Sequence, residues 1–247
     1  MESEKQFVCM KWGKFYTADY VNRLYNSVKR HTTPPFTFYC LTNESEGINP
    51  EVKILPCPTV PIPHPMCVRG WRKVSLWGKP EITGLNGQIL FLDLDLIITG
   101  SLDEFFTYQG KSDYLVMYNY TTPGRNIGNT SVFRLTVGAH PEVYEKLLAE
   151  PLEMQKAYRN SQTFVSRTAP SMDFWPDPWI RHYKTHCLRP WPLYLFLQPR
   201  IFPDAKIFAC TGHPRPDELV EGKWKSPWYK KFYKHTPPVK FVQENWR

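Results

Sequence analysis

The chain has 247 residues, of which 42% are hydrophobic and 22% are charged, a balance that excludes wholesale disorder. It carries 24 prolines but 13 glycines, and 15% of its residues are aromatic, so it is not a low-complexity chain either. Its 31 Lys and Arg exceed its 23 Asp and Glu, and the net charge of +8 suits phosphate-bearing ligands, anionic membrane surfaces or nucleic acid without choosing among them.

The first 55 residues alternate between strand and helix patterns. A short apolar run over Phe7–Lys11 predicts a strand, and apolar residues at helical spacing over Ala18–Arg30 predict a helix. Phe36–Thr42 and Val52–Leu55 predict two further strands. Strands that alternate with a helix predict an α/β fold with parallel pairing.

The middle of the chain contains its strongest strand pattern. Five prolines over residues 56–65 predict a stiff extended loop, and a helix is expected from Trp71 to about Gly78. Gln88–Ile98 then predicts one central strand that is buried on both faces. Ser101 and Glu104 have the spacing of a capping box, which predicts a short helix beginning at Ser101.

The second half begins with regular patterns and becomes irregular. Tyr114–Tyr118 and Ser131–Leu135 predict strands, and Pro141–Ala149 predicts a helix that starts on proline. Beyond about residue 160 the sequence is rich in proline and tryptophan, and we expect it to wrap the same sheet. We therefore predict one domain over residues 1–247, within the size range of single domains.

Several classes of protein are disfavoured by what the sequence lacks. No apolar run approaches the roughly 18 residues of a membrane span. The acidic N-terminus has no apolar signal core, so we expect a cytoplasmic protein. The six cysteines form no Cys-x-x-Cys pair, which argues against a structural zinc site and favours reduced thiols.

The most informative motif is FLDLDLIITG, residues 91–100. Within one strand, Asp93 and Asp95 would point to the same face, because strand side chains alternate. Two carboxylates in an apolar strand are costly unless they are compensated. A Mg²⁺ or Mn²⁺ ion, with diphosphate oxygens completing its shell, is the natural compensation. The alternative is a structural pair that caps a helix or binds Arg and Lys.

This context resembles nucleotide-sugar glycosyltransferases of the GT-A fold, particularly family 8, the glycogenin-like and galactosyltransferase-like group, and its bacterial surface-polysaccharide relatives. FLDLDLIITGSLDEFF, residues 91–106, is similar to the group's Asp-x-Asp strand and the helix after it. Residues 11–31 resemble the group's first helix, and residues 69–77 resemble its basic helix. Residues 129–135 resemble its sugar-facing strand, and residues 211–218 resemble its C-terminal His-Gly-x-x-Lys-Pro element.

The resemblance spans about residues 6–230 and implies a single Rossmann-like α/β domain with a mostly parallel sheet and helices on both faces. About residues 6–135 would bind the nucleotide sugar, and about residues 136–230 would lie on the acceptor side. Asn129 and Ser131 would hydrogen-bond the donor sugar or line the acceptor cleft. Their alternative is an ordinary polar turn before a strand.

The resemblance also implies how the leaving group is held. Asp95 would bind the metal, and Asp93 would bind the metal or the donor ribose. The metal would neutralise the leaving nucleoside diphosphate. Lys73, with Arg72 or Arg69, would stabilise the same leaving group, and a solvated helix face is the alternative for any one of these three.

The sequence departs from the family pattern at two places. The family's C-terminal histidine, a third metal ligand, matches Thr211, and a small loop shift would be needed for His213 to replace it. The family's Asp-Gln pair is absent, so Asp177 or Asp173 would contact the sugar, orient the acceptor hydroxyl or act as base. Asp177 precedes an expected helix over residues 178–183, and an N-cap is its alternative. If both features are lost, the chain binds metal weakly or is inactive.

The C-terminal segment, residues 223–247, carries seven Lys and Arg against one acid, Glu244, interleaved with aromatic residues. We expect most of this segment to pack on the sheet. Contact with the inner face of an anionic membrane is a further expectation, because Lys attracts anionic head groups and Trp and Tyr suit the interface. No recognition motif indicates nucleic acid.

The leading interpretation is a metal-dependent, hexosyltransferase-like glycosyltransferase of polysaccharide biosynthesis. It would move a sugar from a nucleotide-sugar donor to a glycan or lipid-linked acceptor, and the resemblance implies retention of configuration. A non-catalytic protein of the same fold that binds glycan or nucleotide is one alternative. An aspartyl-phosphate phosphatase is the other, although Ile97 stands where that motif usually has Thr or Val.

Overall fold

The computed structural model describes residues 4–62 and 70–247. The chain folds into two compact units. The first comprises Met1–Asn22, Pro34–Leu94 and Glu104–Trp175, and the second comprises Arg23–Thr33, Asp95–Asp103 and Pro176–Arg247. Helix α1 (Ala18–Arg30) begins in the first unit and ends in the second. A single domain over the whole chain stays a prediction.

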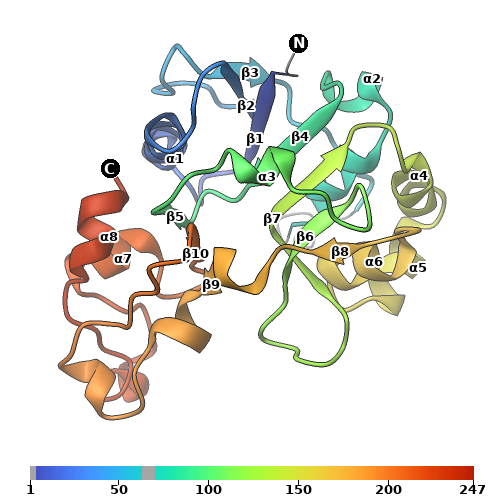
Figure 1. The fold of residues 1–247 in the computed structure, drawn as a ribbon. Helices are drawn as coiled ribbons and strands as arrows, with labels where there is room; N and C mark the ends of the chain where they lie inside the picture. The colour runs from blue at the N-terminus through green and yellow to red at the C-terminus, as the bar shows by residue number, and fades with distance from the viewer. Residues whose placement is uncertain (1–3, 63–69) are drawn as a thin grey trace. The chain divides into compact units, whose positions relative to one another are not determined.

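In the described part of the first unit, a seven-stranded sheet has the order β3-β2-β1-β4-β7-β6-β8 (Figure 1). The pairs from β3 to β4, and the pair of β6 with β8, are parallel, whereas β7 runs antiparallel to β4 and β6. The predicted α/β class with a mostly parallel sheet is confirmed. The strands are β1 (Lys5–Lys11), β2 (Phe36–Thr42), β3 (Lys53–Leu55), β4 (Gln88–Leu92), β6 (Leu115–Tyr118), β7 (Gly128–Thr136) and β8 (Asp173–Phe174).

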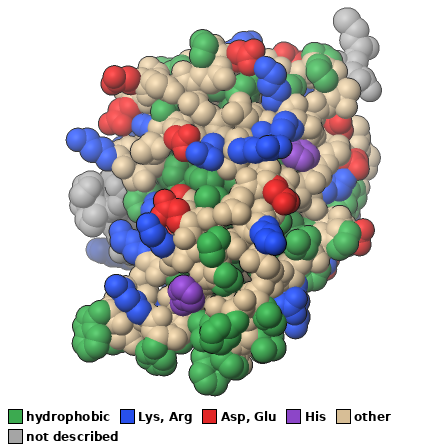
Figure 2. Space-filling model, turned by 90° about the vertical axis from the view of Figure 1, so that its left-hand side faces the viewer, with side chains coloured by type: hydrophobic (Ala, Val, Ile, Leu, Met, Phe, Trp, Pro, Cys, Tyr) green, Lys and Arg blue, Asp and Glu red, His purple; other side chains and the backbone are tan. Residues whose placement is uncertain are grey.

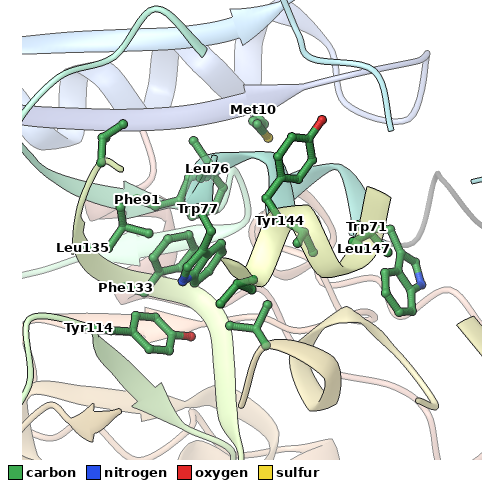
Figure 3. Close-up of a cluster of buried hydrophobic side chains, with 14 of the residues drawn as sticks. Met10, Trp71, Leu76, Trp77, Phe91, Tyr114, Phe133, Leu135, Tyr144 and Leu147 are labelled. Carbon is green, nitrogen blue, oxygen red and sulfur yellow. The ribbon is translucent and has the colours of Figure 1, made fainter. Parts of the chain in front are cut away.

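One face of this sheet packs into a buried aromatic core (Figure 3). The ring of Phe133 on β7 stacks between Phe91 of β4 and Trp77, at centroid distances of 4.8 and 4.9 Å. Burial of such large rings is a main source of stability in cores. The segments that cover this face are the 3₁₀-helix η2 (Trp71–Trp77), α4 (Pro141–Ala149), α5 (Pro151–Ala157) and α6 (Ser161–Thr168).

The opposite face of the sheet meets α3 (Glu104–Thr107). Phe7 of β1 packs edge-on against Phe106, with ring centroids 5.1 Å apart. The guanidinium of Arg134, on β7, donates to the carbonyl oxygens of Phe105 and Tyr108 at 2.7 and 2.9 Å. Helices therefore cover both faces, as expected. A further short helix, α2 (Pro80–Thr83), precedes β4.

In the described residues of the second unit, a three-stranded sheet has the order β5-β10-β9. Here β10 pairs antiparallel with β5 and parallel with β9. The chain's end is held by α1, because the Arg23 guanidinium lies 4.5 Å from the Trp246 ring centroid and donates to the Trp246 carbonyl at 2.9 Å. The elements are β5 (Leu96–Ile98), η3 (Asp177–Trp179), β9 (Ile180–His182), η4 (Tyr183–Cys187), η5 (Leu193–Leu195), β10 (Ile207–Ala209), α7 (Pro216–Glu221), η6 (Trp228–Lys230) and α8 (Lys240–Asn245).

The prediction of one central strand over Gln88–Ile98 is wrong. Strand β4 ends at Leu92, residues 94 and 95 form a turn, and β5 pairs with β10 in the other sheet. Aspartate is disfavoured in strands, and two of them in three residues interrupt this one. The expectation that Asp93 and Asp95 share one face of a strand is therefore also wrong, because neither residue lies in a strand.

Two predicted helix starts are also corrected. The helix expected from Ser101 begins at Glu104, because the Ser101 hydroxyl accepts from the Asp103 amide at 3.2 Å in a turn. The helix expected over residues 178–183 does not form, and its residues enter η3, β9 and η4. The other predicted strands and helices are present within a few residues of their expected bounds.

Five cysteines are buried free thiols, as expected, and Cys67 falls outside the described residues: Cys9, Cys40, Cys57, Cys187 and Cys210. No helix in the described ranges is long and apolar enough to cross a membrane.

Candidate functional site

In the first unit, Lys73 and Asp93 form a close ion pair. Lys73 Nζ, brought by η2, lies 2.5 Å from Asp93 Oδ1, and the two side chains are 11% and 21% exposed. The same ammonium donates to the Thr130 carbonyl oxygen at 3.2 Å. Asp93 follows β4 directly, and its backbone amide donates to the Ser131 carbonyl at 2.9 Å. The structure therefore brings together Lys73, which was predicted to bind the donor phosphates, and Asp93, the first predicted metal ligand.

Asn129 and Ser131 lie within β7, which begins at Gly128, earlier than predicted. Both are buried, and Asn129 Oδ1 accepts from the Ser131 amide at 3.0 Å. The alternative of a polar turn before the strand is wrong for this pair. Polar side chains in a buried strand beside Asp93 are consistent with a sugar-binding role, which stays a prediction.

The arginines predicted beside Lys73 contribute differently. Arg72 Nη1 donates to the Pro58 carbonyl at 3.3 Å and lies 3.9 Å from Cys57 Sγ, so it fastens the proline-rich loop. Arg69 lies outside the described residues, as does the end of that loop. Of the two predicted basic residues that the structure describes, Lys73 pairs with Asp93 and Arg72 contacts the proline-rich loop instead.

Asp173, one of two candidate catalytic acids, is also in the first unit, on β8. Its Oδ2 accepts from the Lys111 amide at 2.8 Å and its Oδ1 accepts from its neighbour Phe174 at 2.9 Å. Both oxygens are thus engaged by backbone amides, which is typical of a carboxylate that fixes a loop. A catalytic role for Asp173 stays a prediction.

In the second unit, Asp95 is buried in the turn before β5, with 8% of the residue exposed. Its carbonyl oxygen lies 3.4 Å from the Cys210 amide that donates to it. Lys184 of η4 interacts electrostatically with Asp95 and with Cys210. Burial lowers the pKa of the Lys184 ammonium, the charge of Lys234 lowers it further, and Cys210 and Asp95 oppose that shift.

Lys184 is a candidate functional residue that sequence reasoning missed. It lies in a π-helical turn, a feature that is frequent at functional sites. A side chain added at Gly212 would approach its ammonium to 3.8 Å, so Lys184 lies beside the C-terminal element that resembles the family's. The sequence signal available was a lysine among His and Cys in YKTHC, and it does not reveal the proximity to Asp95.

His213, the candidate third metal ligand, is oriented by a carboxylate. Its Nδ1 lies 2.8 Å from Glu218 Oε2, and Glu218 also accepts from the backbone amides of Arg215 and Lys225. Metal-bound histidines commonly have such a carboxylate on the other ring nitrogen. The arrangement leaves Nε2 of His213 as the nitrogen that can ligate a metal.

Thr211, at the position of the family's histidine, contacts a different histidine. Its Oγ1 lies 2.6 Å from Nε2 of buried His182, whose Nδ1 lies 2.6 Å from the Thr185 hydroxyl. Burial, with the charges of Lys184 and His186, lowers the pKa of His182 to about 4, so the ring is neutral at pH 7. His182 therefore holds Thr211 in place.

Asp177, the other candidate acid, is exposed in η3. Its Oδ2 lies 2.9 Å from Nη1 of Arg181, and its side chain is 68% exposed. The helix that it was expected to cap is absent, so the N-cap alternative is wrong. Exposure leaves the carboxylate accessible to a ligand, and its catalytic role stays a prediction.

The donor chemistry of the aspartates fits a hard divalent cation. Mg²⁺ and similar ions are commonly held by one or two carboxylates, with substrate phosphates and waters completing the shell. No group of three or more His, Cys, Asp and Glu side chains gathers among residues 4–62 and 70–247. A metal at Asp93 or Asp95 would thus depend on ligand oxygens for most of its coordination.

Comparison with solved structures decides the fold. The galactosyltransferase LgtC, in complex with donor and acceptor sugar analogs, superposes with a TM-score of 0.61 at 13% identity, over 92% of this chain and 99% of LgtC. The chain has the GT-A glycosyltransferase fold. The fold implied by the resemblance to family 8 is therefore confirmed. No protein-family model and no curated protein matches the sequence.

Two other GT-A neighbours are longer proteins. The bifunctional glycosyltransferase WbbM matches at 14% identity with a TM-score of 0.57, over 97% of this chain and 52% of WbbM. The glycosyltransferase GlyE of Streptococcus pneumoniae matches at 13% identity with a TM-score of 0.58, over 98% of this chain and 62% of GlyE. This chain spans little more than half the length of both.

Proposed function

We propose that this protein is a metal-dependent glycosyltransferase that moves a hexose from a nucleotide-sugar donor to a glycan or lipid-linked acceptor. The observation that carries the proposal is the Lys73–Asp93 pair at the end of β4, where the chain continues as Leu94-Asp95. A buried cation beside a carboxylate in a GT-A sheet supports binding of a nucleoside diphosphate. The donor and acceptor analogs bound by LgtC support the same kind of ligands here.

Asp93 and Asp95 would hold Mn²⁺ or Mg²⁺, and His213 would add its Nε2. When bound, the cation supplies charge neutralisation for the departing diphosphate. Lys73 would supply the protein's own positive charge for these phosphates, because a lysine ammonium is a compact phosphate-binding charge. Lys184, in the second unit, is a further candidate phosphate-binding residue.

The remaining predicted residues are assigned to the sugars. Asn129 and Ser131 would hydrogen-bond the hydroxyls of the donor sugar from β7. Asp177, with its exposed carboxylate, would orient the acceptor hydroxyl or take up its proton, and Asp173 is the second candidate for that step. We propose that transfer retains the anomeric configuration and serves polysaccharide synthesis.

Contact with an anionic membrane surface is proposed for the C-terminal segment, residues 223–247. Its exposed aromatic residues include Trp228, Tyr229 and Phe232, which are 54% to 82% exposed. Figure 2 shows hydrophobic side chains gathered at the lower end of the face that it draws. Co-sedimentation with anionic vesicles should fall in a Trp228→Ser/Phe232→Ser variant. Unchanged co-sedimentation would contradict this contact.

The test of the activity is release of nucleoside diphosphate. The protein is incubated with Mn²⁺, a panel of nucleotide sugars and candidate glycan acceptors. Asp95→Asn should lower the release rate by on the order of 100-fold, the typical cost of removing an electrostatic stabiliser of the transition state. Asp204→Asn, the same change at an exposed position, should leave it unchanged. An equal loss in both variants would contradict the assignment.

A non-catalytic nucleotide-binding protein is the second candidate. It is favoured by the absence of a three-ligand cluster in the described ranges and by the threonine at position 211. Binding of a nucleoside diphosphate without turnover of any nucleotide sugar would support it. Hydrolysis of a generic phosphomonoester that is lost in Asp93→Asn would instead support the phosphatase alternative.

A further inference from the structure

A cavity of about 540 Å³ lies in the second unit, where the C-terminal segment, residues 223–247, begins. Its described lining comes from one stretch of chain, residues 218–235, and includes neither Asp95 nor Lys184. The charged and titratable residues that line it are Glu218, Lys223, Lys225, Lys231, Lys234 and His235.

The acid in this lining, Glu218, is already engaged. Its carboxylate accepts from the backbone amides of Arg215 and Lys225 at 2.8 and 3.2 Å, and it pairs with His213 at 2.8 Å. Lys223 pairs with Glu221, which is not part of the described lining. The lining therefore offers a ligand mainly positive charge and hydrogen-bond donors.

Two buried donors in the same lining lack partners. Trp224 Nε1 and Ser226 Oγ are buried, and neither has a hydrogen-bond partner within the described residues. An indole N–H can only donate, and a serine hydroxyl can donate as well as accept. Both residues line the cavity, so these N–H and O–H donors belong to the same wall as the lysines.

The positive potential extends beyond the cavity. The Lys234 ammonium, which lies 5.9 Å from the Trp224 ring centroid, also interacts with Lys184. An anion bound in the cavity would offset the repulsion between these two ammoniums.

We propose that this cavity binds a phosphate ester carried on a sugar. Lysine ammoniums and neutral N–H and O–H donors are the groups that hold phosphate oxygens in proteins. The volume exceeds what one phosphate fills and leaves room for the sugar that bears it. In the proposed reaction this ligand is a phosphorylated acceptor. That role rests on the proposed function, whereas the binding site itself does not.

The test is calorimetric titration of the full chain with glucose 6-phosphate and with glucose. Wild type should bind glucose 6-phosphate and give no heat with glucose. Lys231→Gln/Lys234→Gln should weaken binding at least about tenfold, since two charge-assisted contacts are lost. The control Lys146→Gln/Lys156→Gln removes the same charge from exposed helical positions and should bind as wild type does.

A saturating nucleoside diphosphate with Mn²⁺ separates this site from the donor site. Binding of glucose 6-phosphate that persists under this condition supports a second site. Displacement by the nucleoside diphosphate would overturn the proposal, because the cavity would then hold the donor's phosphates. Equal weakening in the two lysine variants, or binding to anionic vesicles without binding to glucose 6-phosphate, would also overturn it. None of these readouts requires sugar transfer.

Discussion

Lys73 Nζ and Asp93 Oδ1 lie 2.5 Å apart, and both side chains are largely buried. The pair connects the 3₁₀-helix before the motif to the end of β4. The Lys73 ammonium balances the charge of the Asp93 carboxylate within the protein, so the buried carboxylate has a partner without any bound ligand. The same ammonium also donates a hydrogen bond to the Thr130 carbonyl oxygen, which fixes its position against β7.

The pair should be measurable as a coupling in stability. Lys73→Met should lower the free energy of unfolding by about 1–3 kcal/mol, because it leaves the Asp93 carboxylate buried without its charge-assisted partner. In Lys73→Met/Asp93→Asn that penalty should be partly relieved. A urea double-mutant cycle should give a coupling of about 1–2 kcal/mol between these positions. Additive effects would contradict the pair.

Lys184 should contribute to phosphate binding from the second unit. Lys184→Gln should weaken binding of a nucleoside diphosphate about tenfold, the worth of one charge-assisted contact. Lys184→Arg should retain part of the affinity, since it keeps the charge. Lys240→Gln, at an exposed position of α8, is the matched control. Equal affinities of Lys184→Gln and Lys240→Gln would remove Lys184 from the site.

The aromatic stack should dominate the stability of the first unit. Phe133 is fully buried between Trp77 and Phe91. Phe133→Ala should therefore cost about 3–5 kcal/mol, from lost burial and from the cavity it leaves. Phe15→Ala, at an exposed ring, should cost far less, and similar urea midpoints for the two variants would contradict the packing.

Buried His182 should make stability depend on pH. Its pKa is lowered to about 4 from an ordinary value of 6.5, so between these values the unfolded chain binds more protons than the folded one. The contribution of His182 to the free energy of unfolding is therefore complete above pH 6.5. It is lost as the pH falls toward 4, by about 3 kcal/mol in total. His186, whose pKa burial also lowers, acts in the same direction.

The check is urea unfolding across this pH range in wild type and His182→Gln. The variant should show a shallower loss of stability on acidification. It should also be less stable at neutral pH, since the hydrogen bonds to Thr185 and Thr211 change. Identical slopes for the two proteins would show that His182 is not buried in its neutral form.

Much of the fold follows from local patterns. The strand over Phe36–Thr42 and the helices over Ala18–Arg30 and Pro141–Ala149 have the predicted bounds, because their periodicity and proline positions are local signals. The break between β4 and β5 was not predictable in this way. The two aspartates interrupt the strand locally, but the pairing of Leu96–Ile98 with Ile207–Ala209, far along the chain, is tertiary and has no local signal.

The candidate site likewise combines features that the sequence predicts with features that depend on tertiary structure. The resemblance assigned Asp93 and Lys73 to the binding of the same nucleotide-sugar donor, and the structure pairs the two side chains. The proximity of Lys184 to Asp95 depends on the chain path through β9 and η4, which no local pattern encodes. The alternative of an N-cap at Asp177 depended on a local helix-start pattern, and Ile180–His182 instead pairs with β10.

The most direct test of the central claim is calorimetric titration with nucleoside diphosphates in the presence and absence of Mn²⁺. We predict that wild type binds at least one of them, that chelation of Mn²⁺ weakens this binding, and that Asp95→Asn abolishes the dependence on Mn²⁺ while remaining folded. Absence of binding to every nucleoside diphosphate, or an unchanged Mn²⁺ dependence in folded Asp95→Asn, would contradict the account.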